Sequence, residues 1–70
     1  MSRSIRVIVN GKDRRIEGES TLSDLLQFLE LDPRAVAVEL NKQIVRRARL
    51  STVQLNDGDR IELVHFVGGG

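Results

Sequence analysis

The chain has no cysteine, no tryptophan and no tyrosine, and its 70 residues include one histidine, one proline and two phenylalanines. Without cysteine there is no disulfide framework, no thiolate nucleophile, and no zinc or iron–sulfur site built on thiolates. Because secreted domains of this size often carry disulfides, their absence favours the cytoplasm. The lack of tyrosine and tryptophan also removes the usual platforms for stacking on nucleic-acid bases.

The sequence also lacks a strong charge of either sign and a long hydrophobic run. Eleven basic residues stand against ten acidic ones, for a net charge of +1, so there is little overall attraction to phosphate backbones. No apolar run approaches the ~20 residues that cross a bilayer, and "MSRSIRVIVNGK" has no signal-peptide core. We therefore expect a soluble, cytoplasmic protein with no nucleic-acid, membrane or metal partner.

The length limits what the chain does alone. A chain of 70 residues forms one domain and buries roughly 60% of the surface that its unfolded form exposes. That leaves room for one sheet and about one helix, with little space for a deep pocket. The size favours a protein that works with partners and is not itself an enzyme.

The N-terminal part predicts a hairpin. Ile5, Val7 and Val9 alternate along one strand, Asn10-Gly11 is typical of a tight turn, and residues 14–17 return as a second strand. A two-residue loop would place Ile16 opposite Ile5, and a four-residue loop would place it opposite Val7. Both registers put Ile16 on the same face as the three alternating residues, which is therefore the core face.

A helix is predicted from residue 21. Thr21 is the expected N-cap and Asp24 completes a capping box. Pro33 prevents the helix from continuing much past Leu31. Four leucines at helical spacing form one stripe, which indicates core packing far more than a partner-binding face: Leu22, Leu25, Leu26 and Leu29.

The C-terminal half predicts three more strands. "AVAVEL" (35–40) is a strand with Glu39 on the wet face, residues 44–45 form a short edge strand, and residues 46–55 are irregular. A turn at residues 56–59 precedes the last strand, expected over residues 60–67. Its alternation places His65 on the core face with Ile61 and Leu63, as a packed or hydrogen-bonded histidine. Glu62, Val64 and Phe66 share the other face.

The order β-β-α-β-β-β predicts an α+β fold. The first and last strands are the most apolar and belong side by side at the centre of a mixed sheet of four or five strands. One helix covers one face, which is a ubiquitin-like β-grasp arrangement. We expect a domain over residues 1–67 and a flexible C-terminal glycine tail over residues 68–70.

One helix leaves the other face of the sheet uncovered. The alternation places Ile8, Val64 and Phe66 there, and an exposed apolar patch often marks a docking surface. Together with Val67, these residues lead directly into the three glycines. We favour a docking surface; the alternatives are that a loop covers the patch or that these apolar residues are scattered surface positions without a function.

Several motifs resemble the ThiS sulfur-carrier family of thiamin biosynthesis over essentially the whole chain. They are "VNGK" (9–12), "TLSDLL" (21–26), "VAVELNKQIVRR" (36–47) and "LNDGDRIELVHFVGGG" (55–70). The family's working element is a terminal Gly-Gly, whereas this sequence finishes with a run of three glycines, residues 68–70.

The resemblance implies a covalent carrier. A ThiF-like E1 enzyme, using ATP and Mg, would adenylate the carboxylate of Gly70, and a sulfur donor such as a cysteine desulfurase persulfide would convert it to a thiocarboxylate. A ThiG-like thiazole synthase would then take the sulfur. Gly69 and Gly68 would give the tail access to the partner sites, and the chain itself would bind no cofactor.

Other interpretations remain open from the sequence. The same tail could serve molybdopterin synthesis or another sulfur-transfer pathway, or could join a ubiquitin-like tag to target lysines. "RRAR" (46–49) suggests nucleic-acid binding, but the balanced charge favours a solvated strand edge or a contact with an acidic partner.

Overall fold

The computed structural model describes residues 3–66. The expected domain boundary at residue 67 and the expected flexible tail over 68–70 lie outside the described residues and stay predictions. In the described part the elements are β1 (Ser4–Val9), β2 (Lys12–Glu17), α1 (Leu22–Phe28), the 3₁₀ turn η1 (Pro33–Ala35), β3 (Val36–Leu40), β4 (Gln43–Val45), the 3₁₀ turn η2 (Arg47–Arg49) and β5 (Arg60–His65).

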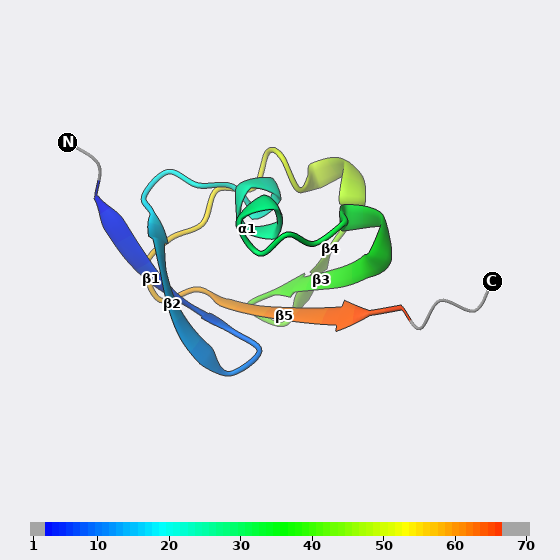
Figure 1. Cartoon of the computed structure of the whole chain (residues 1–70), viewed down its shortest axis with the longest axis horizontal. Coiled ribbons are helices and arrows are strands. Elements are labelled where there is room, and N and C mark those ends of the chain that lie inside the picture. Colours follow the sequence, from blue (N-terminus) through cyan, green and yellow to red (C-terminus); the bar gives the residue numbers. More distant parts are fainter. Residues whose placement is uncertain (1–2, 67–70) are drawn as a thin grey trace.

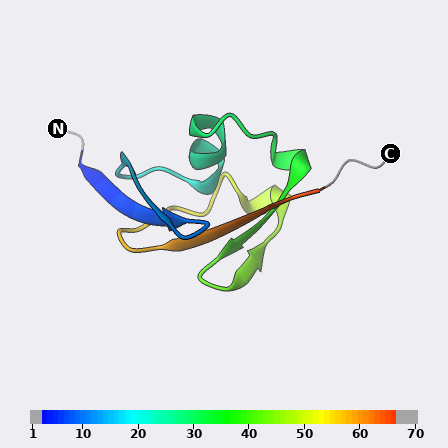
Figure 2. The same ribbon diagram turned by 60° about the horizontal axis from the view of Figure 1, so that its bottom comes forward.

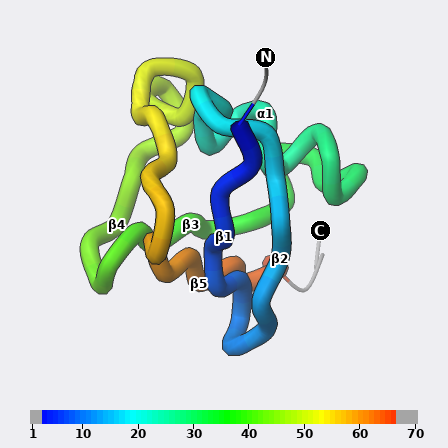
Figure 3. Tube along the Cα trace, turned by 90° about the vertical axis from the view of Figure 1, so that its left-hand side faces the viewer, coloured from blue at the N-terminus to red at the C-terminus, as the bar shows by residue number. Residues whose placement is uncertain are grey.

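The strands form one mixed sheet in the order β2-β1-β5-β3-β4 (Figures 1 and 3). β1 and β5 are parallel neighbours at its centre, and the other neighbouring pairs are antiparallel. Figure 2 shows α1 on one side of this sheet. The predicted α+β, ubiquitin-like β-grasp arrangement is confirmed, with five strands.

The first hairpin has the two-residue register. Asn10 and Gly11 both have positive φ, 49° and 81°, as a tight hairpin turn requires. Val9 pairs with Lys12, and Ile5 pairs with Ile16. Because the turn uses no further residues, β2 begins at Lys12, two residues before the predicted start.

The helix begins as predicted and ends earlier. The Asp24 N–H donates to the Thr21 hydroxyl at 3.1 Å, and the Thr21 N–H donates to the Asp24 carboxylate at 2.9 Å, which is the capping box. At the other end Glu30 has φ 60°, and the Leu31 N–H donates to the Leu26 carbonyl. This is a Schellman motif with glutamate in place of the usual glycine, so α1 stops at Phe28.

The core lies between α1 and the sheet. The helix leucines Leu22, Leu25 and Leu26 are at most 1% exposed, while Leu29 packs against the core edge. Strand residues of the predicted face complete the core, and Leu50 and Leu55 of the irregular segment cover its side. The strand residues in the core are Val7, Val9, Ile16, Val36, Val38, Ile61 and Leu63.

Two predictions about the last strand are wrong in detail. β5 ends at His65 and not at Val67, so Phe66 follows the strand, although its N–H still donates to the Ala35 carbonyl at 2.9 Å. His65 is exposed and not packed, because the end of β5 runs beyond the part of the sheet that α1 covers (Figure 1).

Candidate docking surface

Large apolar side chains are exposed where β5 ends. Val64 is 59% exposed and Phe66 is 60% exposed. Ala37 of β3 pairs with Val64 and is also exposed. In the described part of the chain no loop covers these residues, so the sheet presents them to solvent beside the point where residues 67–70 begin.

Ile44 of β4 belongs to the same face, and the sequence analysis did not identify it. Its side chain is 76% exposed, and it pairs with Glu39, which lies on the uncovered face. Asn41 and Lys42 have φ of 51° and 72°, so the β3–β4 hairpin is also a two-residue turn. Assigning that turn from "NK" would have placed Ile44 opposite Glu39 and thus in the open.

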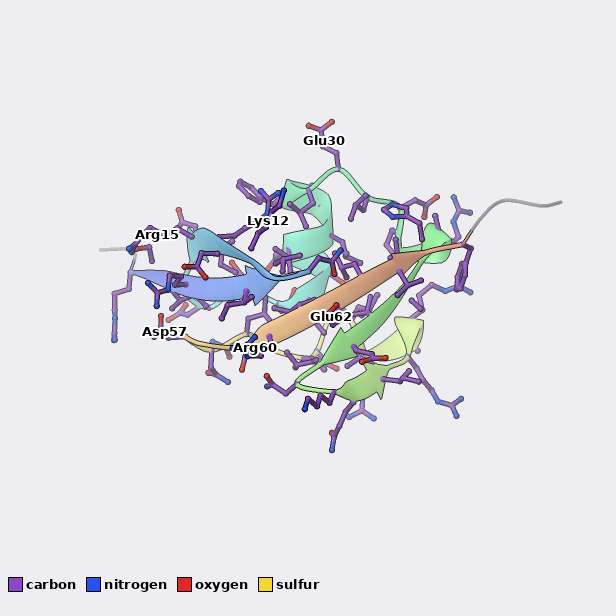
Figure 4. The ribbon with its side chains drawn as sticks, turned by 90° about the horizontal axis from the view of Figure 1, so that it is seen from below. Lys12, Arg15, Glu30, Asp57, Arg60 and Glu62 are labelled. Carbon is purple, nitrogen blue, oxygen red and sulfur yellow. The ribbon has the colours of Figure 1, made fainter. Side chains whose placement is uncertain are left out.

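Ile8, in contrast, does not join these residues. It pairs with Arg60 at the start of β5, which is about 13 Å along the strand from Val64. Glu62 follows Arg60 on β5 (Figure 4) and precedes Val64 on the same face, and Ile8 is half-buried. Ile8 therefore lies on the uncovered face as predicted, but the expectation that it forms one contiguous apolar patch with Val64 and Phe66 is wrong. The apolar patch consists of Ala37, Ile44, Val64 and Phe66.

The remaining predicted site residues, Val67, Gly68, Gly69 and Gly70, lie outside the described residues. The structure shows the position of Phe66, the residue that precedes them. The hydrogen bond from the Phe66 N–H to the Ala35 carbonyl attaches the residue before them to the end of η1, directly before β3. Phe66 therefore stands at the rim of the apolar patch.

Two asparagine side chains hold β5 in place from either side. The Asn10 side-chain amide donates to the Leu63 carbonyl at 3.2 Å, and its oxygen accepts the Leu63 N–H at 2.7 Å. The Asn41 oxygen accepts the Arg60 N–H at 3.0 Å, and its amide donates to the Asp59 carboxylate at 3.0 Å. The strand that carries Val64 and leads to Phe66 is thereby fixed to both hairpin turns.

Charged groups of both signs lie beside the patch, since Glu39 pairs with Ile44 and with Glu62. The Arg34 guanidinium contacts the Asp32 carboxylate at 3.2 Å, and this hydrogen-bonded pairing, with the Arg34 N–H, lowers the pKa of Asp32. Among residues 3–66 no group of three His, Asp or Glu side chains could hold a metal ion, and no helix is long and apolar enough to cross a membrane.

Together, a five-stranded mixed sheet, a single covering helix and an apolar patch at the start of the C-terminal residues define a ubiquitin-like β-grasp protein with an open sheet face. The chain belongs to the ThiS family: the ThiS family model matches residues 7–70. It is 46% identical to the sulfur carrier protein ThiS of Bacillus subtilis, over 89% of this chain and 96% of that one. The crystal structure of the thiamine biosynthesis protein ThiS from Geobacter metallireducens superposes with a TM-score of 0.80 at 32% identity, covering 94% of this chain and 100% of that one.

A second kind of relative is much longer. The chain is 41% identical to a thiazole synthase of Paramagnetospirillum magneticum over 94% of its own length. It spans only 20% of that protein, and the same share of a thiazole synthase from Magnetococcus marinus. A ThiS-like segment thus occurs within larger proteins named for thiazole synthesis.

Proposed function

We propose that this chain is a sulfur carrier for thiazole formation in thiamin biosynthesis. In this proposal Gly70 is the C-terminal residue and carries the sulfur as a thiocarboxylate. A ThiF-like E1 enzyme adenylates it with ATP, and a ThiG-like thiazole synthase accepts the sulfur. The chain acts in the cytoplasm as a co-substrate of these enzymes and not as a catalyst.

The observation that carries the proposal is the family match through residue 70, together with similarity to a curated sulfur carrier over nearly the full length of both chains. The thiazole synthases that contain a similar segment support thiazole formation as the pathway.

The chemistry needs the main chain alone. A carboxylate resists nucleophiles at neutral pH because of its charge and its poor leaving group. Attack of the Gly70 carboxylate on the α-phosphate of ATP releases pyrophosphate and gives an acyl adenylate. Hydrosulfide displaces AMP from it directly; a donor persulfide displaces AMP to give an acyl disulfide, which a thiol then cleaves to the thiocarboxylate.

Burial of the apolar patch would offset part of the cost of ordering the tail. Ordering three glycines in an enzyme channel costs about 3–6 kcal/mol at ~1–2 kcal/mol per residue. Taking a fully exposed phenylalanine or valine to full burial contributes about 1.5–3 kcal/mol. Because Val64 and Phe66 are 59% and 60% exposed, burying what remains of them offsets about 2–4 kcal/mol, which is part of that cost. Val67 would add to this contact. Ile8 of β1, which pairs with Arg60 at the start of β5, is not part of the proposed contact.

Genetic complementation tests the proposal. The full chain should restore growth without thiazole to a bacterial strain that lacks its own sulfur carrier, and a variant without Gly69 and Gly70 should not, although both unfold at the same temperature. Growth with the shortened variant would overturn the proposal. Rescue of a molybdopterin defect in place of the thiazole defect would show that the pathway is wrong.

A further inference from the structure

The turn between β1 and β2, Asn10 and Gly11, is also a reactive point in the chain. Asparagine is one of the thermolabile residues of proteins, because the main-chain nitrogen of the following residue can attack its side-chain carbonyl carbon. The attack is easiest when that residue is glycine, which has no Cβ to obstruct a close approach. The sequence contains three asparagines, at positions 10, 41 and 56, and only Asn10 precedes a glycine.

The reaction changes the main chain as well as the side chain. The Gly11 nitrogen forms a bond to Cγ of Asn10 and gives up its proton, while the side-chain amide nitrogen takes a proton and leaves as ammonia. The product is a five-membered succinimide ring. Water then opens the ring at one of its two carbonyl carbons, which gives either aspartate or isoaspartate at position 10; in isoaspartate the main chain runs through Cβ. Water is the one co-reactant.

The surface around the turn is open to this chemistry. Asn10 and Gly11 are both exposed, and a Cβ built on Gly11 would meet no atom within 4 Å. A surface hollow of about 320 Å³ reaches Asn10, with Lys12 and Arg14 among the residues that line it. Positive charge at this position favours the negative charge that develops when the nitrogen attacks.

Hydrogen bonds to β5 oppose the reaction. The Asn10 side-chain amide donates to the Leu63 carbonyl at 3.2 Å, and its oxygen accepts the Leu63 N–H at 2.7 Å. The Asn10 main-chain N–H also donates to the Ile61 carbonyl at 2.9 Å. The nitrogen that must leave is therefore the one that the Leu63 carbonyl holds, and ring closure has to break these side-chain bonds. That requires the turn and β5 to separate.

The products cannot restore the original contacts. An ionised aspartate only accepts hydrogen bonds, so a carboxylate oxygen would face the Leu63 carbonyl where the amide donated before. Isoaspartate adds a main-chain carbon to a two-residue turn, whose length sets the register of Val9 opposite Lys12. Both products leave β5 less firmly attached to the turn.

We propose that Asn10 is a site of spontaneous deamidation, that the separation of β5 from the first hairpin turn sets its rate, and that the reaction makes the loosening of β5 irreversible. The hydrogen bonds between Asn10 and Leu63 thus protect the chain from a modification that its own turn sequence favours. This inference does not depend on the proposed function, because the reaction involves only the chain and water.

Peptide mapping by mass spectrometry tests the site and its protection. During incubation of the full chain at mildly alkaline pH, Asn10 should gain about 1 Da. The gain should be at least about tenfold faster when guanidinium chloride unfolds the chain, since the folded chain reacts only through its opened form. Asp57, which precedes Gly58, can isomerise by the same route without a change in mass. Equal rates in the folded and unfolded chain, or no gain at Asn10 when it is unfolded, would overturn the inference.

Asn41 provides a matched control within the same chain. It also begins a two-residue turn, and its side chain accepts the Arg60 N–H at 3.0 Å, but Lys42 follows it. In the unfolded parent chain Asn41 should react more slowly than Asn10. Lys42→Gly should turn Asn41 into a second site that is also protected by folding, and Lys42→Ala should not. Failure of Lys42→Gly to react at Asn41 when unfolded would contradict the role assigned to the following glycine.

Hydrogen exchange tests the consequence for β5. The isoaspartyl chain is separated from the parent by chromatography, and exchange of the Leu63 amide proton is followed by NMR. This proton should exchange at least about tenfold faster than in the parent chain, whereas the Leu26 amide of α1 should change less than about twofold. Unchanged exchange at Leu63 would show that the modification does not loosen β5 and would overturn that part of the inference.

Discussion

The side chain of Asn10 pairs with the main chain of Leu63 as a neighbouring strand would. It donates to the Leu63 carbonyl and accepts the Leu63 N–H, at 3.2 and 2.7 Å, although 53 positions separate the two residues. The parallel β1–β5 pairing runs over Ile8 and Val9, and Asn10 extends it by this amide after β1 has turned away. The attachment of β5 to β1 is thereby extended to Leu63, the residue before Val64 of the apolar patch.

Replacing Asn10 with glycine should destabilise the fold by about 1–3 kcal/mol, the net value of two hydrogen bonds at ~0.5–1.5 kcal/mol each. Glycine is the suitable replacement because it accepts the positive φ of 49°. Asn10→Asp keeps the acceptor for the Leu63 N–H and loses the donor, so its stability should lie between the two. Chemical denaturation measures all three, and a glycine variant as stable as the parent chain would contradict this role.

Lys42 offers a gain in stability. Its φ of 72° costs an L-residue about 1–2 kcal/mol, whereas glycine loses about 0.5–1 kcal/mol in entropy when it is ordered. Lys42→Gly should therefore stabilise the chain by about 0.5–1 kcal/mol, seen as a higher melting temperature. Lys42→Ala removes the same charge and keeps the Cβ, and it should give no gain; an equal gain from alanine would show that charge and not backbone strain is responsible.

The Asp32–Arg34 pair predicts a defined pH response. The hydrogen bonds from Arg34 hold the pKa of Asp32 below its ordinary value. A carboxyl whose pKa is depressed by folding contributes stability above its unfolded pKa, and this contribution disappears as the pH falls through the folded pKa. NMR titration should find the Asp32 midpoint below that of an unfolded aspartate, and Arg34→Gln should raise it. An unchanged midpoint in that variant would exclude the side-chain pair as the main cause.

The two phenylalanines form a matched pair for testing the docking patch. Phe66 is 60% exposed and Phe28 is 62% exposed, but Phe28 lies at the end of α1, away from the apolar patch. Phe66→Ala should weaken binding to the adenylating enzyme at least about tenfold, and Phe28→Ala should leave it unchanged. Calorimetric titration measures both. A similar loss from Phe28→Ala would mean that the enzyme contacts a different face.

Much of this architecture follows from local patterns that act over a few residues. The capping box at Thr21 and Asp24, the Asn10-Gly11 turn and the alternation in β1 and β5 each have a short-range cause, and the sheet order follows from the apolar character of β1 and β5. The helix end could not be predicted from Pro33, because a Schellman turn at Glu30 ends α1 before the proline has an effect.

The docking surface was predicted less completely, because its composition depends on register between strands that are distant in sequence. Alternation assigns Ile8 and Val64 to one face, but it does not say how far apart they lie along the parallel pair, where Ile8 pairs with Arg60 and Glu62 precedes Val64. Ile44 was overlooked because its exposure depends on the two-residue turn at Asn41 and Lys42, which lacks a glycine.

Intact-mass spectrometry of the purified chain, after incubation with ATP, Mg²⁺, a ThiF-like enzyme and a sulfur source, tests the central claim most directly. Replacement of one carboxyl oxygen by sulfur should raise the mass by about 16 Da, and fragmentation should place the change at Gly70. The account predicts that this species disappears when ATP is omitted. An unchanged mass under conditions in which the enzyme modifies its own carrier, or high-mass conjugates joined through Gly70, would contradict it.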